Sequence, residues 1–286
     1  MDYFLKNYLL LERYLNVSVE CKTTILNHFE GYQHIKWSYV ADQKKHFKIP
    51  ENCIMPGTIE GQQIQRDCME EMIRIQRSGI DYITPQSKYY PEILYHYKPY
   101  VKMMFSKGCK ELLGHHIRVG IVGSRKPTSY GRKVAYDLGK YLAKHGIVVV
   151  SGMALGIDAQ AHRGALDVGG KTIAVLASGV NHIYPLTNEP IYRSILNQEG
   201  LILSEQFIDD SALRHHFPLR NRIISAISDV VVIIEAGDQS GSLITATHAI
   251  EQGKTVFALP GNINSPQSVG SNRLIRSEER RVGKQC

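Results

Sequence analysis

The hydrophobic pattern of the chain changes near residue 118. From Arg118 onward, short runs of β-branched and other apolar residues alternate with segments whose apolar residues recur at helical spacing. In the helical segment 129–145, Val134, Leu138 and Leu142 share one face. The alternation predicts an α/β domain with a doubly wound, mostly parallel sheet and right-handed crossovers. The predicted strands are 118–122, 147–150, 172–177, 201–204, 230–235 and 255–259.

The first part of the chain has a different pattern. Aromatic-rich helical segments span 3–15, 22–30 and 62–78. They predict a small helical domain over residues 1–78, followed by the sheet domain over residues 79–275. The stretch 81–113 is rich in prolines and aromatics, and we expect it to lead into the sheet domain and to pack on the sheet.

Composition narrows the class of protein. The chain has 286 residues, of which 43% are hydrophobic and 21% charged, so it can bury a core. It lacks a run of apolar residues long enough for a membrane span, and Asp2 and Lys6 lie where a signal peptide would be apolar. The five scattered cysteines form no C-x-x-C pair, which disfavours disulfides and a zinc site. We expect a cytoplasmic protein without a metal or a membrane partner.

The net charge is +7, spread thinly along the chain. Such an excess permits nucleic-acid binding but does not demonstrate it. The placement of individual basic residues is therefore more informative than the total.

The loop after the first predicted strand has the composition of a phosphate-binding turn. In an open parallel sheet, ligands bind beyond the carboxyl ends of the strands. Gly123 and Ser124 allow the backbone to approach an anion, and Arg125 can pair with phosphate oxygens. The helix that begins near Ser129 offers free N–H groups. The alternative is a tight turn with a surface arginine.

The loop after the second strand carries Gly152 and Gly156, which suggest another close backbone approach. In the same segment, Asp158 is predicted to cap the N-terminus of the next helix. His162, four residues further on, is then its local partner. For this pair we favour a structural role over a catalytic one.

Two later loops also carry polar and basic residues. Arg220 and Arg222 flank Asn221 in the first turns of a helix, where a phosphate would explain the two cations; internal salt bridges to Glu205 or Glu235 are the alternative. After the fifth strand, hydroxyl and N–H groups are presented at a helix start by Ser240, Gly241 and Ser242.

The sequence lacks the motif spacings that several classes of enzyme require. A dinucleotide site needs G-x-G-x-x-G, whereas the first strand carries Gly120-x-x-Gly123. The stretch 169–172 imitates the end of a P-loop but precedes a strand, and Ala165 stands where the first glycine belongs. No G-x-S-x-G or H-E-x-x-H motif is present. We therefore expect no catalytic residues and no cofactor.

Six motifs in order resemble the DNA processing protein A family, also called Smf. They are 122–125 with Tyr130-Gly131, 151–162, 169–175, 184–188, 217–224 and 240–245. The resemblance covers roughly 160 residues. It implies a non-enzymatic protein with an extended Rossmann-like fold. Such proteins bind single-stranded DNA without strong sequence preference, protect incoming transforming DNA, load the recombinase RecA onto it and act as dimers.

The resemblance also implies a DNA-binding surface at the strand ends. Successive phosphates would meet the glycine-rich turns, with charge from the nearby arginines and from Lys171. The predicted contact residues are Gly123, Ser124, Arg125, Gly152, Gly156, Lys171, Arg220, Asn221, Arg222, Ser240, Gly241 and Ser242.

The chain departs from the family pattern in three places. One is the N-terminal domain, where residues 16–19 lack the glycine-rich hairpin of a helix-hairpin-helix. Leu186 follows the Tyr-Pro pair where family members often have a basic residue. The tail 276–286 matches nothing in the family, which favours a truncated C-terminal part, and the family's dimer contact lies toward this end.

Two other functions stay open. A nucleotide-processing enzyme of the phosphoribohydrolase type shares the fold, but the segment 236–245 lacks that family's catalytic glutamate. A purely structural or interaction module would use its arginines as internal salt-bridge partners.

Overall fold

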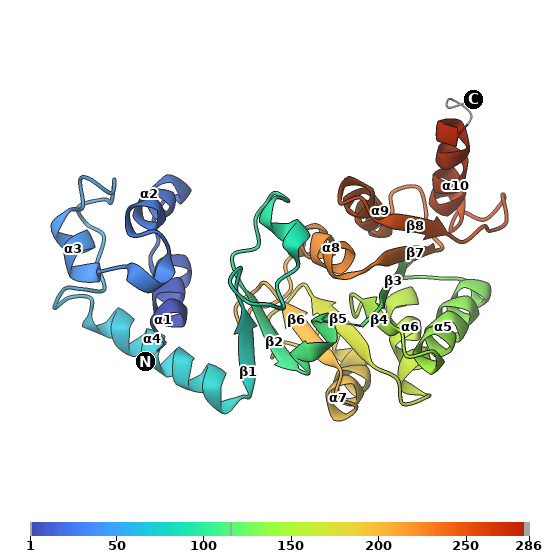
Figure 1. The fold of residues 1–286 in the computed structure, drawn as a ribbon, viewed down its shortest axis with the longest axis horizontal. Helices are drawn as coiled ribbons and strands as arrows, with labels where there is room; N and C mark the ends of the chain where they lie inside the picture. Colours follow the sequence, from blue (N-terminus) through green and yellow to red (C-terminus); the bar gives the residue numbers. More distant parts are fainter. Residues whose placement is uncertain (1, 115, 283–286) are drawn as a thin grey trace. The chain divides into compact units, whose positions relative to one another are not determined.

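The computed structural model describes the backbone of residues 2–114 and 116–282 and the side chains as far as Arg276 (Figure 1). It divides into two compact units, Met1–Gly79 and Ile80–Cys286. Residues 283–286, the end of the predicted tail, lie outside the described residues.

The N-terminal unit is helical, as predicted. Side chains cap its first two helices: Asp2 accepts from the backbone N–H of Leu5 at 3.0 Å, and Ser18 accepts from that of Cys21 at 3.2 Å. A short helix that the sequence analysis missed begins at Trp37, whose indole N–H donates to the buried Asn7. The helices are α1 (Tyr3–Leu9), continued by a π-helical turn (Leu10–Tyr14), α2 (Val19–Phe29), α3 (Trp37–Asp42) and α4 (Gln62–Arg77).

The second unit is built on one eight-stranded sheet in the order β1-β2-β6-β5-β4-β3-β7-β8. The pairs from β6 to β8 are parallel, whereas β1 and β2 pair antiparallel with their neighbours. The predicted α/β class with a mostly parallel sheet is confirmed. The strands are β1 (Ile80–Ile83), β2 (Met104–Gly108), β3 (Arg118–Gly123), β4 (Val148–Ser151), β5 (Thr172–Leu176), β6 (Leu201–Ser204), β7 (Val230–Ile234) and β8 (Thr255–Ala258).

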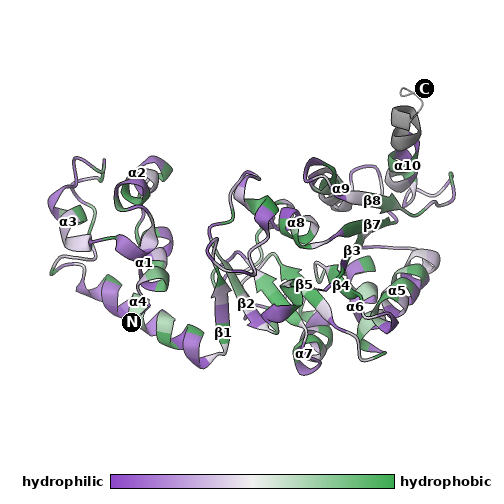
Figure 2. Cartoon of the chain, in the orientation of Figure 1, coloured by the Kyte–Doolittle hydropathy of each residue, from purple (hydrophilic) through white to green (hydrophobic). Residues whose placement is uncertain are grey.

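The six predicted strands correspond to β3–β8, and each predicted end lies within one residue of the observed end. These strands could be predicted because they are apolar runs: in Figure 2, β5 and β7 are mostly hydrophobic along their whole length. The strands β1 and β2 were not predicted. Their segment was expected only to pack on the sheet, but it extends the sheet by two strands.

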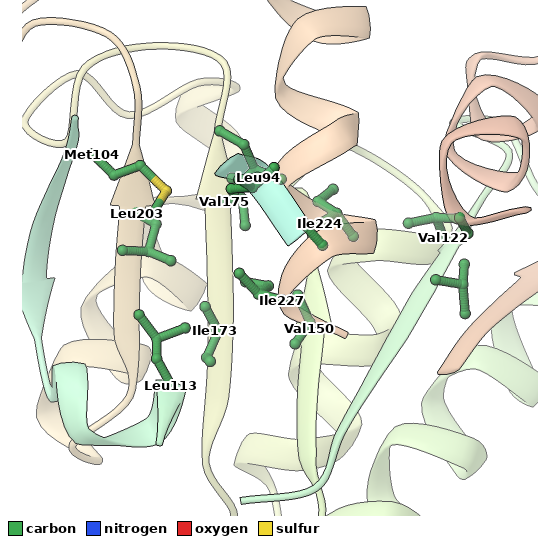
Figure 3. Close-up of a cluster of buried hydrophobic side chains, with 14 of the residues drawn as sticks. Leu94, Met104, Leu113, Val122, Val150, Ile173, Val175, Leu203, Ile224 and Ile227 are labelled. Carbon is green, nitrogen blue, oxygen red and sulfur yellow. The ribbon is translucent and has the colours of Figure 1, made fainter. Parts of the chain in front are cut away.

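Helices cover both faces of this sheet. A hydrophobic core lies on each face. Successive side chains of β4 point to opposite faces, so Val148 and Val150 belong to one core and Val149 to the other. In the first core, Ile224 and Ile227 lie among the strand residues (Figure 3). The helices of this unit are α5 (Ser129–Lys144), α6 (Ile157–Leu166), α7 (Glu189–Asn197), α8 (His216–Ile227), α9 (Gly241–Glu251) and α10 (Val269–Val282).

The strand order creates a topological switch point between β3 and β7. The chain proceeds from β3 through β4 and β5 to β6 and then returns to the other side of β3 as β7. At the carboxyl ends of this pair, Gly123 lies beside Ile234, and a Cβ on Gly123 would come within 1.8 Å of the Ile234 carbonyl oxygen. Ligand sites of such sheets form at this position because the two following loops diverge there.

The buried His162 on α6 does not pair with Asp158, contrary to the prediction. Its Nδ1 lies 2.7 Å from the hydroxyl of Thr172, and that hydroxyl donates to the carbonyl of Val149. The Thr172 oxygen therefore accepts from Nδ1–H, and the buried Nε2 is left without a partner in the described structure. Burial lowers the pKa of His162 from 6.5 to about 3.

We expect His162 to make the fold sensitive to acid. Between pH 6.5 and 3 the histidine binds a proton in the unfolded chain but not in the folded one. Each unit by which the pH falls therefore lowers the free energy of unfolding by up to about 1.4 kcal/mol. The variant His162→Gln should therefore lose less stability than the wild type when the pH falls from neutral to mildly acidic. Urea unfolding at several pH values measures this, with the exposed His34→Gln as control. An identical pH dependence in the wild type and His162→Gln would contradict the prediction.

Candidate functional site

A cavity of about 460 Å³ lies at the switch point. It is bounded by the loops that follow β3 and β7, by the first turns of α8 and by the start of α9. The structure thus brings together eight of the twelve predicted contact residues. These are Gly123, Ser124, Arg125, Arg220, Asn221, Ser240, Gly241 and Ser242.

Arg125 is an exposed cation in the wall of this cavity. Its guanidinium carbon lies 4.6 Å from the centre of the Phe217 ring, a cation–π distance. The edge of Phe217 in turn contacts Tyr184, with 5.9 Å between ring centres. The exposed Lys126 follows Arg125 in the cavity wall. The cavity therefore combines positive charge with an aromatic surface.

The contact prediction omitted Phe217 and Lys126. Phe217 stands one helical turn before Arg220 and Asn221 in the same segment, so an aromatic residue near the cations was visible in the sequence. Its stacking on Arg125 was not, because Arg125 lies in the loop after β3 and Phe217 in the first turn of the distant α8.

Ser124 positions the Arg125 loop. It is 7% exposed, and its hydroxyl donates to Gln267 at 2.9 Å and accepts from the backbone N–H of Lys126 at 3.1 Å. Gly156 supports the same loop from α6. It has a positive φ of 81°, and a Cβ there would lie 2.4 Å from the Ser124 carbonyl oxygen. The loop shape is thus held by residues beside and beneath Arg125.

Arg220 is a buried cation in the wall of the cavity. Its Nη1 donates to the carbonyl of Gly152 at 2.5 Å and to that of Val175, and its Nε donates to Asn221 at 3.2 Å. Asn221 also donates to the Gly241 carbonyl, which joins α8 to the start of α9. Burial lowers the pKa of Arg220 to about 10, and Asp158 partly opposes this shift, so the guanidinium stays charged at neutral pH.

The close approach predicted at Gly152 is present, but its partner is Arg220. A Cβ on Gly152 would lie 2.2 Å from Nη1 of that arginine. Asp158 lies in the first turn of α6, whose N-cap is Gly156, and its carboxylate accepts from the N–H groups of Gly152 and Ala154. The predicted capping of the helix by Asp158 is therefore wrong, because the carboxylate holds the preceding loop. Burial raises the pKa of Asp158, and Arg220 opposes that shift.

The N-terminus of α5 is already occupied, which corrects the prediction of free N–H groups near Ser129. The buried carboxylate of Glu235 accepts from the backbone N–H of Thr128 at 2.8 Å and from its hydroxyl. The Thr128 hydroxyl oxygen accepts from the N–H of Gly131 at 3.2 Å. An internal carboxylate thus takes the place that we predicted for a ligand phosphate.

The N-terminus of α9 is open to the cavity. Ser240 is its N-cap: its hydroxyl accepts from the backbone N–H of Ser242 at 3.4 Å and lies 2.8 Å from the Ser242 hydroxyl. A Cβ on Gly241 would meet nothing within 4 Å, so this first turn faces open space. Among the helix starts proposed as anion sites, this one has the predicted geometry.

Arg222 is an internal ion-pair partner, and its prediction as a contact residue is wrong. Its Nη2 donates to both carboxylate oxygens of Glu205 at 2.8 Å, Nε donates to the Pro99 carbonyl, and Nη1 donates to the Leu219 carbonyl. The residue is buried. Positions two apart on a helix point about 200° from one another, so Arg220 and Arg222 leave α8 on opposite sides.

Lys171 does not belong to the cavity either. It immediately precedes β5, so it lies at the amino end of the parallel strands, away from the cavity at their carboxyl ends. Its ammonium group pairs with Glu199 and donates to the Gln198 carbonyl at 3.0 Å.

Among the side chains that the structure describes, no group of three or more from histidine, cysteine, aspartate or glutamate could hold a metal ion. Over the same residues, no helix is both long and apolar enough to cross a membrane.

Residues 81–285 match the family model described as DNA recombination-mediator protein A. The chain belongs to this family. The resemblance seen in the six motifs is therefore confirmed. The matched range extends to residue 285, so the prediction that the tail 276–286 matches nothing in the family is wrong.

Relatives of the family align with most of the second unit. The chain is 40% identical over 198 residues to the DNA processing protein DprA of Bacillus subtilis, covering 69% of this chain and 66% of that protein. It is 42% identical over 194 residues to the protein Smf of Escherichia coli, covering 68% and 52%. The chain thus spans about two thirds of the length of the first relative and about half of the second.

Two solved structures of family members have similar folds. DNA processing protein A from Streptococcus pneumoniae superposes with a TM-score of 0.74 at 29% identity, covering 97% of this chain and 94% of that one. DNA processing protein A from Helicobacter pylori, whose structure is described as showing its single-stranded DNA binding mode, gives 0.63 at 36% identity, covering 70% and 90%.

Proposed function

We propose that the chain binds single-stranded DNA through the cavity at the switch point, without strong sequence preference. The observation that carries this proposal is the exposed Arg125 stacked on Phe217 beside the open start of α9. A guanidinium and the positive end of a helix suit phosphates, and an aromatic ring suits any base, so such contacts carry little sequence information. The DNA-binding mode described for the Helicobacter pylori family member supports the same ligand.

Membership of the family supports a wider role. We propose that the protein protects single-stranded DNA and helps to load RecA onto it during DNA uptake, natural transformation and recombination. On this proposal it works as a homodimer in the cytoplasm. These statements concern the whole protein, and the chain spans only part of its longer relatives.

We further propose that the protein is not an enzyme. In the rival class of phosphoribohydrolases, a catalytic glutamate follows the glycine-rich turn after this strand. Here the loop from Ala236 to Thr245 has none, and the carboxylate of the neighbouring Glu235 is engaged by Thr128. Release of the base from AMP by the purified chain would contradict this part of the proposal.

Fluorescence anisotropy with mixed-sequence oligonucleotides, single- and double-stranded, tests the binding proposal across a range of salt concentrations. We expect tighter binding to the single strand and an affinity that falls with added salt, because phosphate contacts release counterions. Oligonucleotides of different sequence should bind with similar affinity. Preferential binding of the duplex, or an affinity independent of salt, would contradict the proposal.

A further inference from the structure

A second cavity, of about 650 Å³, lies at the opposite end of the same strands. Arg118 opens β3, Ile227 ends the helix before β7, and Lys254 precedes β8. All three residues therefore stand at the amino ends of the parallel strands. With about 3.3 Å per strand residue, the six residues of β3 separate the two cavities by roughly 20 Å.

The wall of this amino-end cavity is aromatic and basic. The segment before β2 contributes Tyr89, Tyr90 and Tyr95. Tyr95 is 43% exposed as a residue. The centre of its ring lies 5.0 Å from that of Tyr90, whose hydroxyl donates to the Val101 carbonyl at 2.7 Å. Tyr95 is held by its hydroxyl, which donates to the carbonyl of Pro85. A fixed ring with an accessible surface is suited to stacking on a flat ligand.

Three cations and one carboxylate, that of Glu92, line the same cavity. Arg118 serves the fold: it donates to the Ile227 and Gly114 carbonyls and pairs with Asp229 at 3.9 Å. Lys88 and Lys254, by contrast, are not held by an ion pair within the described residues.

The ammonium group of Lys88 lies 4.9 Å from the centre of the Tyr89 ring. The side chain of Lys254 is half-buried. Neither lysine has an ion-pair partner within the described part of the chain. The wall therefore carries excess positive charge, with two ammonium groups available to an anion.

We propose that this cavity binds a nucleoside-phosphate unit, with Lys254 and Lys88 on the phosphate and the base stacked on Tyr95. Its volume lies in the range of small-ligand sites, roughly 300–1,000 Å³. Both a free nucleotide and a nucleotide within a single strand supply this chemistry. For the second source the inference rests on the proposed function, and the DNA would then contact both ends of the sheet.

Photo-crosslinking identifies the occupant. Iododeoxyuridine monophosphate and single-stranded oligonucleotides that contain iododeoxyuridine are irradiated with the full chain, and labelled peptides are mapped by mass spectrometry. We expect label on Tyr89 or Tyr95. Label from the free nucleotide identifies a small-molecule site, and label only from the oligonucleotide identifies a second contact for the strand.

Charge reversal tests the phosphate contact. We expect Lys254→Glu to lower the crosslinking yield at these tyrosines about tenfold, since it removes a charge-assisted hydrogen bond. The exposed Lys88→Glu provides a second variant that does not depend on a half-buried position. The matched control is Lys144→Glu, an exposed lysine at the end of α5, which should leave the yield unchanged.

Absence of label from residues 88–96 with both probes would overturn the proposal, as would an unchanged yield in both reversal variants. Label confined to Tyr184 and Phe217 would overturn it while leaving the proposed function intact. Failure of the proposed function has its own signature, since the anisotropy titration would then show no binding of single-stranded DNA.

Discussion

Replacing Arg125 with alanine is expected to weaken the binding of single-stranded DNA by about 10- to 100-fold, the usual range for losing a hydrogen-bonded charge. Arg125 is exposed at the cavity and contacts the ring of Phe217. The variant loses the phosphate contact and the cation that holds this ring. The slope of log affinity against log salt should become shallower by about 0.7, the value for one phosphate contact on a single strand.

The matched control is Lys144→Ala, which also removes one exposed positive charge from the same unit but at the far end of α5. If binding depended only on the total charge, the two variants would lose affinity equally. We expect Lys144→Ala to bind nearly as the wild type does. An Arg125→Ala variant with unchanged affinity and salt slope would show that the site is misplaced.

The sheet was largely predictable because its central strands are continuous apolar runs. A strand buried on both faces, such as β5, needs no alternation of polar and apolar residues and is bounded by clear loop residues. The strands β1 and β2 were missed for the opposite reason. Neither is a continuous apolar run: Asp81 interrupts β1, and β2 ends in Ser106, Lys107 and Gly108. Their place in the sheet depends on pairing with the distant β6.

The candidate site was predictable in its position but not in its detailed contacts. The rule that ligands bind at strand ends led to Arg125 and to the start of α9. No local pattern shows that Glu235, 107 residues after Thr128 in the sequence, accepts hydrogen bonds from Thr128 at the N-terminus of α5. Likewise, the spacing of Arg220 and Arg222 shows that they face opposite sides of a helix, but not which side carries the cavity. Internal partners of this kind become visible only when the chain is folded.

The ion pair between Arg222 and Glu205 is expected to contribute strongly to the stability of the fold. We expect Arg222→Ala to lower the free energy of unfolding by about 3–5 kcal/mol, the usual cost of breaking a buried pair. The variant leaves the carboxylate of Glu205, whose pKa burial raises, without its bidentate partner. It also frees the carbonyl oxygens of Pro99 and Leu219, which join a loop to α8. Urea unfolding of the variant measures the loss.

Two further variants separate this structural role from DNA binding. Because the cost comes from a largely desolvated carboxylate that has lost its bidentate partner, the double variant Arg222→Met with Glu205→Leu should recover most of the lost stability. The exposed Arg163→Ala on α6 controls for the loss of one positive charge and should unfold as the wild type does. Under conditions where it is fully folded, the double variant should keep the wild-type salt slope, since neither side chain lines the cavity. Wild-type stability combined with weakened DNA binding in Arg222→Ala would instead return this arginine to the DNA-binding surface.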